Sequence, residues 1–297
     1  MPALNEEGAV KKVLVDAETA LKEHEYAIVL VDGRSSDATA DIARDQGAYV
    51  LTQRRRGYGD ALVMGFEHAT KSLDPDIIVM MDADGTYDPR DILKVADPIL
   101  SGDTEMVIGN RLSGMQKQAM TLTNRIGNRL ISSLCRHLLG VAVSDTQCGL
   151  RAFDSKLTST FNSQAEGMSF ATEMLVDAKE AGAGILEVPI HYYPRIGKTK
   201  LSPIRDGLNI LGVIIRLLRD YKPLLFFGAL GVMSVLFGML LGLNTILEWI
   251  QTGTVRHVPT AVLTVLSISV GVEFISLGLV ADMLKGLRRR LQPRLKL

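Results

Sequence analysis

The chain has 297 residues, of which 47% are hydrophobic, and its 33 basic side chains balance 33 acidic ones, so the formal net charge is zero. A neutral chain has no overall basic field, which argues against nucleic acid as a partner. The two cysteines form neither a metal-type cluster nor the disulfide framework of a small secreted domain.

Strand and helix patterns alternate over the first two hundred residues, which predicts an α/β domain with a mostly parallel, Rossmann-like sheet and helices on both faces. The expected strands are 27–31, 48–51, 77–81, 105–109 and 185–190. The expected helices are 7–22, 37–46, 58–72, 89–100 and 122–139. We assign residues 1–200 to this domain.

The start of the chain is unusual for such a domain. Residues 2–7 have the composition of a loop that follows a first strand, but only Met1 precedes them. A sheet without that strand would expose backbone groups and apolar neighbours. We therefore expect that the first strand is missing and that the natural start lies upstream of Met1.

Two long apolar segments occupy the last part of the chain. Residues 224–247 contain no charged side chain, and residues 258–281 contain only Glu273. Each segment has the roughly 20 apolar residues that cross a bilayer. We expect a two-helix transmembrane hairpin within residues 223–297, with a pair of buried core helices as the alternative. Glu273 would mark a contact between copies in a homo-oligomer, a path for lipid headgroups, or a side chain that reaches the interface.

Apolar residues recur at helical spacing just before these spans. Residues 203–221 alternate them with charged side chains, which predicts an amphipathic helix in the membrane interface, within the segment 201–222. A helix packed on the core is the alternative.

Cations flank the spans unequally. Arg216, Arg219 and Lys222 precede the first span and six more follow the second, whereas the loop between them holds only Arg256. Positive charge favours the cytoplasmic side. We expect a multi-pass protein of the cell membrane with both termini and the α/β domain in the cytoplasm, and with its basic tail near anionic lipids.

An apolar run, residues 77–81, ends at two carboxylates, Asp82 and Asp84. Ligands bind beyond the carboxyl ends of strands in open α/β sheets, and alternate side chains point the same way. Mg²⁺ and Mn²⁺ prefer oxygen ligands and are often held by one or two carboxylates plus substrate phosphates. The pair predicts a metal site for a nucleotide diphosphate, with a surface turn as the alternative. Asp32 and Gly33 follow the strand 27–31 in the same way.

Short motifs run through nearly the whole chain in a recognisable order. They are PALNEE at 2–7, DGRSSD at 32–37, GYGDAL at 57–62, DADGTY at 82–87, GNR at 109–111, NRIGNR at 124–129, QCGLRAF at 147–153 and RIGKTKL at 195–201. In these motifs the chain resembles family 2 glycosyltransferases of the GT-A fold, specifically polyprenyl-phosphate sugar synthases typified by dolichol-phosphate mannose synthase. The later motifs and the paired spans look closest to archaeal dolichyl-phosphate hexosyltransferases of protein N-glycosylation.

The resemblance implies roles for the acidic motifs. The nucleotide would contact Pro2, Ala3, Asn5, Glu6, Asp32, Gly33, Asp82 and Ala83. Asp84 would be the principal metal ligand, with Asp82 close to both ribose and metal. The mannose synthases carry a glutamine two residues beyond the second aspartate, where this chain has Thr86, so their metal geometry and nucleotide preference do not transfer directly.

The acceptor of such an enzyme is a lipid phosphate, which is already anionic and needs no strong general base to attack the sugar. Two anionic reactants must instead be positioned and neutralised. The candidate cations are Arg111, Arg125, Arg129, Arg195 and Lys200, and a surface role is the alternative for each arginine. By resemblance, Arg195 and Lys200 belong to a mobile loop over the diphosphate, while Arg125 and Arg129 face the lipid phosphate.

Glu173 follows the acceptor motifs and could touch sugar hydroxyls, with an ordinary helix-surface carboxylate as the alternative.

These features predict inverting transfer of one hexose from a nucleotide-diphosphate sugar to dolichyl phosphate for protein glycosylation. UDP-glucose or UDP-N-acetylglucosamine is the favoured donor, and GDP-mannose is the alternative. A processive polysaccharide synthase would carry a Gln-x-x-Arg-Trp motif and more spans. A non-catalytic membrane scaffold or flippase accessory with a degenerate glycosyltransferase fold is the remaining alternative.

Overall fold

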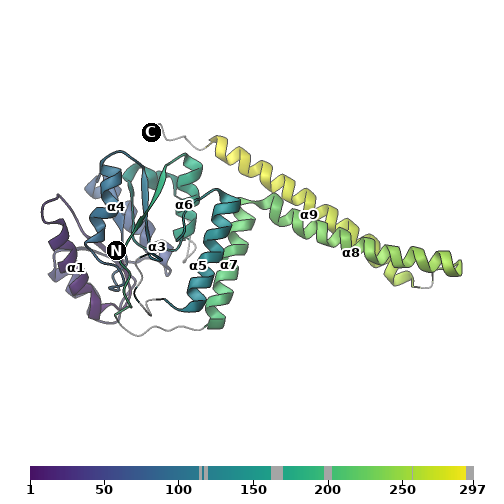
Figure 1. The fold of residues 1–297 in the computed structure, drawn as a ribbon, viewed down its shortest axis with the longest axis horizontal. Coiled ribbons are helices and arrows are strands. Elements are labelled where there is room, and N and C mark those ends of the chain that lie inside the picture. The colour runs from purple at the N-terminus through teal and green to yellow at the C-terminus, as the bar shows by residue number, and fades with distance from the viewer. Residues whose placement is uncertain (114–115, 117–119, 162–169, 197–202, 256, 292–297) are drawn as a thin grey trace. The chain divides into compact units, whose positions relative to one another are not determined.

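A computed structural model describes residues 1–113, 116, 120–161, 170–196, 203–255 and 257–291. The chain divides into two compact units, Met1–Leu211 and Gly212–Leu297 (Figure 1). Each unit is described by itself.

The first unit is an α/β domain (Figure 1). Its strands are β1 (Pro2–Ala3), β2 (Val29–Asp32), β3 (Tyr49–Thr52), β4 (Ile77–Met80), β5 (Met106–Asn110), β6 (Arg151–Asp154) and β7 (Ile185–Pro189). Its helices are α1 (Glu7–Leu21), α2 (Thr39–Asp45), α3 (Tyr58–His68), α4 (Asp91–Leu100), α5 (Leu122–Leu134) and α6 (Phe170–Ala181). The π-helical turns η1 (Ala69–Leu73) and η2 (Cys135–Leu139) extend α3 and α5, and η3 (Ser155–Thr160) is a 3-10 turn.

The strands form two hydrogen-bonded sheets. The first has the order β1-β2-β3 and is parallel throughout. The second has the order β4-β6-β5-β7, in which β6 runs antiparallel to both of its neighbours and β7 runs parallel to β5. All the predicted strands and helices of this unit are present, and their ends agree within two residues when the π-helical turns are included. The elements β6, η3 and α6 were not predicted from the sequence.

The first residues of the chain need a correction. Pro2 and Ala3 do not lie in a loop, as the sequence suggests, but form β1, opposite Val31 and Asp32 of β2. Proline is tolerated at the first residue of a strand because its absent N–H is not needed there. The pairing of β1 with β2 therefore places residues 4–7, which follow β1, beside the carboxyl end of β2.

Two apolar clusters hold this unit together. Ala3, Val10, Leu14, Leu30, Ala43 and Ala83 are buried in one cluster that joins the first sheet, α1 and α2 to the residues after β4. Phe66 packs edge to face against Phe153, and Phe161 packs on both. Aromatic pairs in this geometry add to the stabilisation from burial alone. The first cluster fixes the loop after β4 relative to β1.

The helix α7 (Pro203–Tyr221) begins in the first unit and ends in the second, so the predicted helix over these residues is confirmed. The second unit continues with α8 (Pro223–Thr252) and α9 (Val258–Leu291), which pack against each other along most of their lengths. Both are long and apolar enough to cross a membrane, and an 18-residue stretch within each has a mean hydropathy of 2.4 in α8 and 2.0 in α9. The two predicted apolar helices are thus present.

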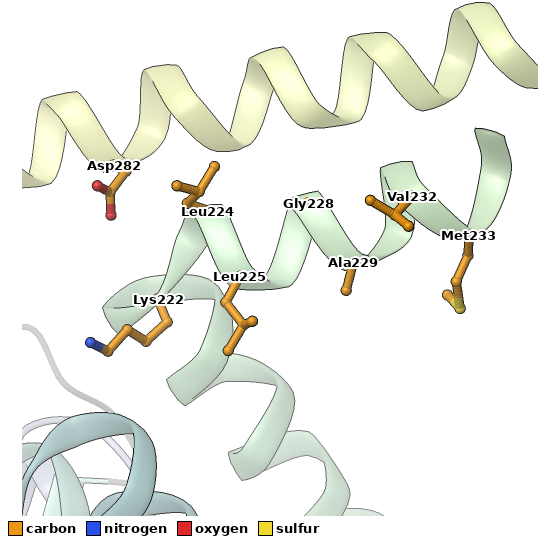
Figure 2. A pocket seen from close by; sticks show the side chains of 8 residues that line it. All are labelled: Lys222, Leu224, Leu225, Gly228, Ala229, Val232, Met233 and Asp282. Atoms are coloured by element: carbon orange, nitrogen blue, oxygen red, sulfur yellow. The ribbon is translucent and has the colours of Figure 1, made fainter. Parts of the chain in front are cut away.

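A groove of about 700 Å³ lies along one side of α8 in the second unit (Figure 2). Its walls are mainly apolar side chains of α8, with Lys222 before the helix and Asp282 from α9 at one end.

Candidate functional site

The two predicted carboxylates lie directly after β4, but their surroundings differ. Asp82 accepts a hydrogen bond from the Tyr58 hydroxyl at 2.9 Å. Asp84 accepts two bonds at a single oxygen, from the N–H (3.1 Å) and the hydroxyl (2.7 Å) of Thr86. Ala83 between them is buried in the core. A buried residue and side-chain hydrogen bonds thus hold this segment, and the choice between a metal site and a surface turn stays a prediction.

Burial raises the pKa of the Asp82 carboxyl to about 6, and the nearby charge of Asp84 adds to the rise while the Tyr58 hydrogen bond opposes it. The second oxygen of Asp82 lies against the backbone of Gly149. A Cβ added to Gly149 would lie only 2.4 Å from that oxygen. Gly149 in turn donates its N–H to the Tyr87 hydroxyl at 2.6 Å. Asp82 is thus confined on both sides.

Arg195 joins the end of β4 to the beginning of α1. Its guanidinium contacts the Glu6 carboxylate, and its Nε lies 3.8 Å from the free oxygen of Asp84. Burial raises the pKa of Glu6, although the charge of Arg195 opposes that rise. The structure therefore brings together three residues that the resemblance had assigned to nucleotide, metal and diphosphate.

The segment that carries Arg195 lies alongside the residues that follow Asp84. Tyr193 donates its N–H to the Thr86 carbonyl at 2.8 Å, and Ile196 donates to the Asp84 carbonyl at 3.3 Å. Tyr192 pairs with Tyr87 in an antiparallel bridge, and their rings lie 5.5 Å apart. These backbone contacts explain how Arg195 reaches Asp84 across a long stretch of sequence.

The carboxyl end of β2 holds the other predicted nucleotide residues. Asp32 accepts two bonds of 3.2 Å from the Ser35 N–H, one at each carboxylate oxygen, and Gly33 donates its N–H to the Ala3 carbonyl at 2.8 Å. Asn5 adopts a positive φ of 55° and accepts a bond of 2.8 Å from the Ser36 N–H. These residues are brought together at one sheet edge, as predicted. Pro2 pairs within the sheet.

Arg111 is already paired with a carboxylate. It makes two bonds of 2.7 Å to Asp145, which is fully buried, and Asn128 donates to the same carboxylate at 2.7 Å. The Arg111 guanidinium also lies over the Tyr192 ring, 5.2 Å from its centre. The charge of Arg111 is thus compensated inside the protein, and its role toward phosphate stays a prediction.

The remaining predicted residues are placed differently. Arg129 on α5 is exposed, whereas the Nε atom of Arg125 is buried and has no hydrogen-bond partner among the described residues. Glu173 on α6 is 8% exposed, so the surface-carboxylate alternative is wrong. Lys200 lies outside the described residues.

Arg151 is a functional candidate that the motifs alone did not single out. It is fully buried and donates to the carbonyl oxygens of Cys148 and Thr146, each at 2.8 Å, and to that of Ala171. A buried charge is tolerated only where its donors are satisfied. Arg151 therefore shapes the loop that presents Gly149 to Asp82. Its position within the QCGLRAF motif was visible in the sequence, but its burial was not.

The site suits a divalent cation only together with a substrate. Among the described residues, no group of three or more His, Cys, Asp or Glu side chains is arranged to hold a metal ion. Asp82 and Asp84 supply the hard oxygen ligands that Mg²⁺ and Mn²⁺ prefer, and such ions are commonly held by one or two carboxylates plus phosphate oxygens. The donor set therefore fits a metal that arrives with a nucleotide diphosphate.

Similar proteins include enzymes with closely matching chains. Glycosyltransferase AglJ of Haloferax volcanii is 33% identical over 298 aligned residues, which cover 99% of this chain and 95% of the relative. A dolichyl-phosphate hexose transferase of the same organism is 35% identical over 73% of this chain and 91% of the relative.

Among solved structures, glucosyl-3-phosphoglycerate synthase from Mycobacterium tuberculosis, crystallised with Mn²⁺, uridine diphosphate and glucosyl-3-phosphoglycerate, matches with a TM-score of 0.57 and 25% identity. The match covers 73% of this chain and 76% of that one. The family model for glycosyl transferase family 2 matches residues 1–160, which include both carboxylates and the ends of β1 and β2. By this match and by the nearly full-length relative, the chain belongs to glycosyl transferase family 2 and is a glycosyltransferase of the GT-A fold.

Proposed function

We propose that this enzyme transfers a single hexose from a UDP-linked sugar to dolichyl phosphate, with inversion at the anomeric carbon. The observation that carries the proposal is the cluster of Glu6, Arg195 and Asp84 beside Asp82, in the loops that follow β1 and β4. A relative named as a dolichyl-phosphate hexose transferase supports the acceptor, and the structural neighbour bound to uridine diphosphate supports the base. UDP-glucose and UDP-N-acetylglucosamine are the favoured donors.

Mg²⁺ or Mn²⁺ would be held by Asp84, through the oxygen that does not bond to Thr86, with Asp82 beside it. The neighbour crystallised with Mn²⁺ supports a divalent ion at this place. When bound, such an ion neutralises charge on the leaving diphosphate. Tyr58 bonds to one oxygen of Asp82 and the Gly149 backbone lies against the other, so Asp84 is the better placed ligand.

The nucleotide would lie against the edge formed by β1 and β2. Asn5 and Asp32 present polar groups there. The backbone at Gly33 lies so close to Ala3 that a Cβ added to Gly33 would lie 3.2 Å from the carbonyl oxygen of Ala3. Glu6 holds Arg195 between this edge and Asp84. Pro2, Asp82 and Ala83 complete the proposed pocket.

The acceptor phosphate requires cations but no strong base, because it is anionic near neutral pH. Arg125 is the clearest candidate, since its buried Nε has no partner among the described residues and an anion would satisfy it. Arg129 adds an exposed guanidinium one turn later on α5. Arg195 and Lys200 would contact the diphosphate. Arg111 is paired with the buried Asp145, so any contact that it made with phosphate would be made while its charge is shared with that carboxylate.

The position in the cell follows from the two apolar helices and the cations around them. We place the catalytic domain, residues 1–200, in the cytoplasm, the segment 201–222 in the membrane interface, and the hairpin within residues 223–297 in the cell membrane. The support is that α8 and α9 are long and apolar enough to span a bilayer. Membership in a glycosyltransferase family argues against the non-catalytic scaffold.

One assay tests the reaction. Purified full-length protein is incubated with dolichyl phosphate, Mg²⁺ or Mn²⁺, and radiolabelled UDP-glucose, UDP-N-acetylglucosamine or GDP-mannose, and the lipid product is extracted. We expect label in the lipid with a UDP-sugar, and none after chelation of the metal. Product from GDP-mannose alone would replace the proposed donor. A folded protein that forms no glycolipid with any donor would overturn the proposal.

Asp84→Asn provides the matched variant for this assay. It keeps the size of the side chain but removes the charge that would hold the metal, so we expect turnover to fall by roughly a hundredfold or more. Asp16→Asn on α1 is the control, because Asp16 is half-exposed and its only ion pair in the described structure is with Lys12. Equal turnover of the two variants would exclude Asp84 as the metal ligand.

A further inference from the structure

Two buried carboxylates at the start of α4 have no role in the site described so far. Asp88 precedes the helix and Asp91 is its first residue, and their exposed fractions are 5% and 1%. Aspartate is rarely buried so fully unless it is paired. The partners of these two side chains therefore indicate what they do.

Asp91 joins α4 to a distant part of the chain. One of its oxygens lies 2.6 Å from Nζ of Lys94, in the same helix. The other accepts the backbone N–H of His191 at 2.6 Å, across 100 residues of sequence, and lies 3.1 Å from Nδ1 of that histidine. The contact with Lys94 is local, so the contact with His191 is the one that connects α4 to the residues that carry Arg195.

Asp88 makes a second connection two residues further on. The Tyr193 hydroxyl donates to it at 3.1 Å. Hydrogen bonds from Arg90 lower the pKa of the Asp88 carboxyl to about 2, so Asp88 is an ionised acceptor at neutral pH. The rings of His191 and Tyr193 lie nearly parallel, with centres 6.4 Å apart. Alternate side chains of an extended segment lie on one side of it, and here that side contacts the start of α4.

The helix offers a firm support for this segment, residues 190–196. Ile92, Val95 and Ala96 of α4 are buried, and the helix packs on β4, β5 and β6. An arginine side chain has many rotamers, so its guanidinium can be directed at one place only if the backbone that carries it is fixed. Arg195 meets that condition two residues after Tyr193, where it contacts Glu6 and approaches Asp84.

We propose that Asp91 is a positioning residue for Arg195: by holding His191 it fixes residues 190–196 to α4 and directs the Arg195 guanidinium toward Glu6 and Asp84. Asp91 contacts neither of those carboxylates in the described structure and acts only through the backbone. The proposal deepens the proposed function and rests on it, because it assumes that Arg195 serves the transfer reaction.

Two substitutions separate the hold on His191 from the charge of Asp91. Asp91→Ala removes the acceptor of the His191 N–H, whereas Asp91→Asn keeps an oxygen that can accept it and loses only the charge. The backbone amides of Tyr193 and Ile196 donate to the loop after β4, so their hydrogen exchange reports how well the segment is held. We expect exchange over residues 190–196 to become roughly tenfold faster in Asp91→Ala and to stay near the native rate in Asp91→Asn.

The same measurement carries its own reference, since exchange over β2 should be equal in all three proteins if they are folded. Native exchange of residues 190–196 in Asp91→Ala would overturn the proposal. Equal acceleration in both variants would overturn it as well, because the charge at the start of α4 would then matter and the hydrogen bond to His191 would not.

Turnover in a double-mutant cycle supplies the second readout. We expect glycolipid formation to fall roughly tenfold in Asp91→Ala and to fall no further when Asp91→Ala is added to Arg195→Gln, because both changes remove the same guanidinium from the site. Losses that multiply in the double variant would mean that Asp91 acts independently of Arg195, which rejects the proposal.

Asp41→Ala is the matched control. Asp41 also lies in the first turn of a helix, α2, and pairs three residues on with Arg44, but its side chain is 80% exposed. That variant should keep native turnover and native exchange over residues 190–196. If the native protein forms no glycolipid, the proposed function fails, while the exchange rates still decide whether Asp91 holds the segment.

Discussion

Asp82 and Asp84 lie one residue apart, yet the chain treats them differently. Asp82 is held by the Tyr58 hydroxyl on one oxygen and faces the Gly149 backbone with the other. Asp84 keeps one oxygen for Thr86 and turns the other toward Arg195. One carboxylate is therefore held on both sides, while the other has an oxygen that lies 3.8 Å from Nε of Arg195. This difference predicts separate roles for the two carboxylates.

The close approach of Gly149 to Asp82 yields the first prediction. In Gly149→Ala the new Cβ would lie 2.4 Å from the Asp82 carboxylate and 3.0 Å from the Tyr87 hydroxyl. Neither group can retreat freely, because Asp82 is bonded to Tyr58 and Tyr87 is buried. We expect a loss of about 1–3 kcal/mol in unfolding free energy and a larger loss of turnover, measured by denaturant titration and glycolipid assay.

Gly8→Ala is the control for that substitution. Gly8 lies in α1, and a Cβ there would meet no atom within 4 Å. Alanine should leave turnover unchanged and add up to about 1 kcal/mol of stability, because it favours the helix. If Gly149→Ala also kept the turnover of the native protein, the proposed confinement of Asp82 would not matter for catalysis.

Arg195 yields the second prediction, because it occupies the surroundings that a metal would need. Its Nε lies 3.8 Å from Asp84, so its charge opposes a cation there until a diphosphate draws it away. In Arg195→Gln we expect Mn²⁺ to bind roughly tenfold more tightly without nucleotide, as measured by electron paramagnetic resonance of free Mn²⁺. Turnover should fall in the same variant.

The control is Arg44→Gln on α2, where the arginine is exposed and pairs with Asp41. That variant should leave Mn²⁺ binding unchanged. Weaker binding of Mn²⁺ to Arg195→Gln than to the native protein would show that Arg195 supports the metal site rather than competing with it.

At the level of secondary structure, short-range patterns predicted most elements correctly. Apolar runs that end in polar residues marked β2 and β4, and amphipathic spacing marked the helices between them. The strand β6 was missed because its four residues, Arg151 to Asp154, begin and end with a charged side chain. Only the antiparallel neighbours β4 and β5, which are distant in sequence, make a strand of it. Pairing between strands that are distant in sequence leaves no hydrophobic periodicity in the sequence of β6 itself.

The partners within the site were harder to predict than the site itself. The motifs gave Asp82, Asp84 and Arg195, but Arg195 meets Glu6 across 189 residues of sequence. Arg111 finds Asp145 across 34 residues. Such contacts depend on how the sheets and loops meet in three dimensions, so a motif can supply a residue type without showing which charge neutralises it.

Close glycine contacts between α8 and α9 yield the third prediction. A Cβ on Gly231 would lie 2.5 Å from the carbonyl oxygen of Gly271, and a Cβ on Gly271 would lie 2.7 Å from that of Gly231. Small residues allow such backbone approach between membrane helices. Gly231→Val should therefore separate the helices and destabilise the hairpin by about 1–3 kcal/mol, lowering the midpoint of thermal inactivation in detergent.

Gly228→Val serves as the comparison on the same helix, because a Cβ there meets nothing within 4 Å. Its midpoint should stay near that of the native protein. Equal midpoints for the two variants would mean that the close approach at Gly231 does not hold the hairpin together.

At the scale of the whole molecule, the charges around the two apolar helices bear on the proposed crossing of the membrane. Basic residues are concentrated before α8, and again in the last turns of α9 and in the tail that follows it. The connection between the two helices carries one arginine. Basic segments are retained on the cytoplasmic side. The catalytic unit and the basic tail should therefore share one side of the membrane, where nucleotide sugars are made and where anionic headgroups attract the tail.

This arrangement yields the last prediction, which uses single cysteines and a maleimide that cannot cross membranes. Gln251→Cys places a thiol at the exposed end of α8, and Lys11→Cys places one on α1 of the catalytic unit. In intact cells we expect Gln251→Cys to be labelled and Lys11→Cys to be labelled only after permeabilisation, because the hairpin loop faces outward. The reverse pattern would invert the orientation, and labelling of both sites in intact cells would mean that the helices do not form a spanning hairpin. Either outcome would move the proposed reaction away from cytoplasmic nucleotide sugars, so the topology decides whether donor and active site can meet.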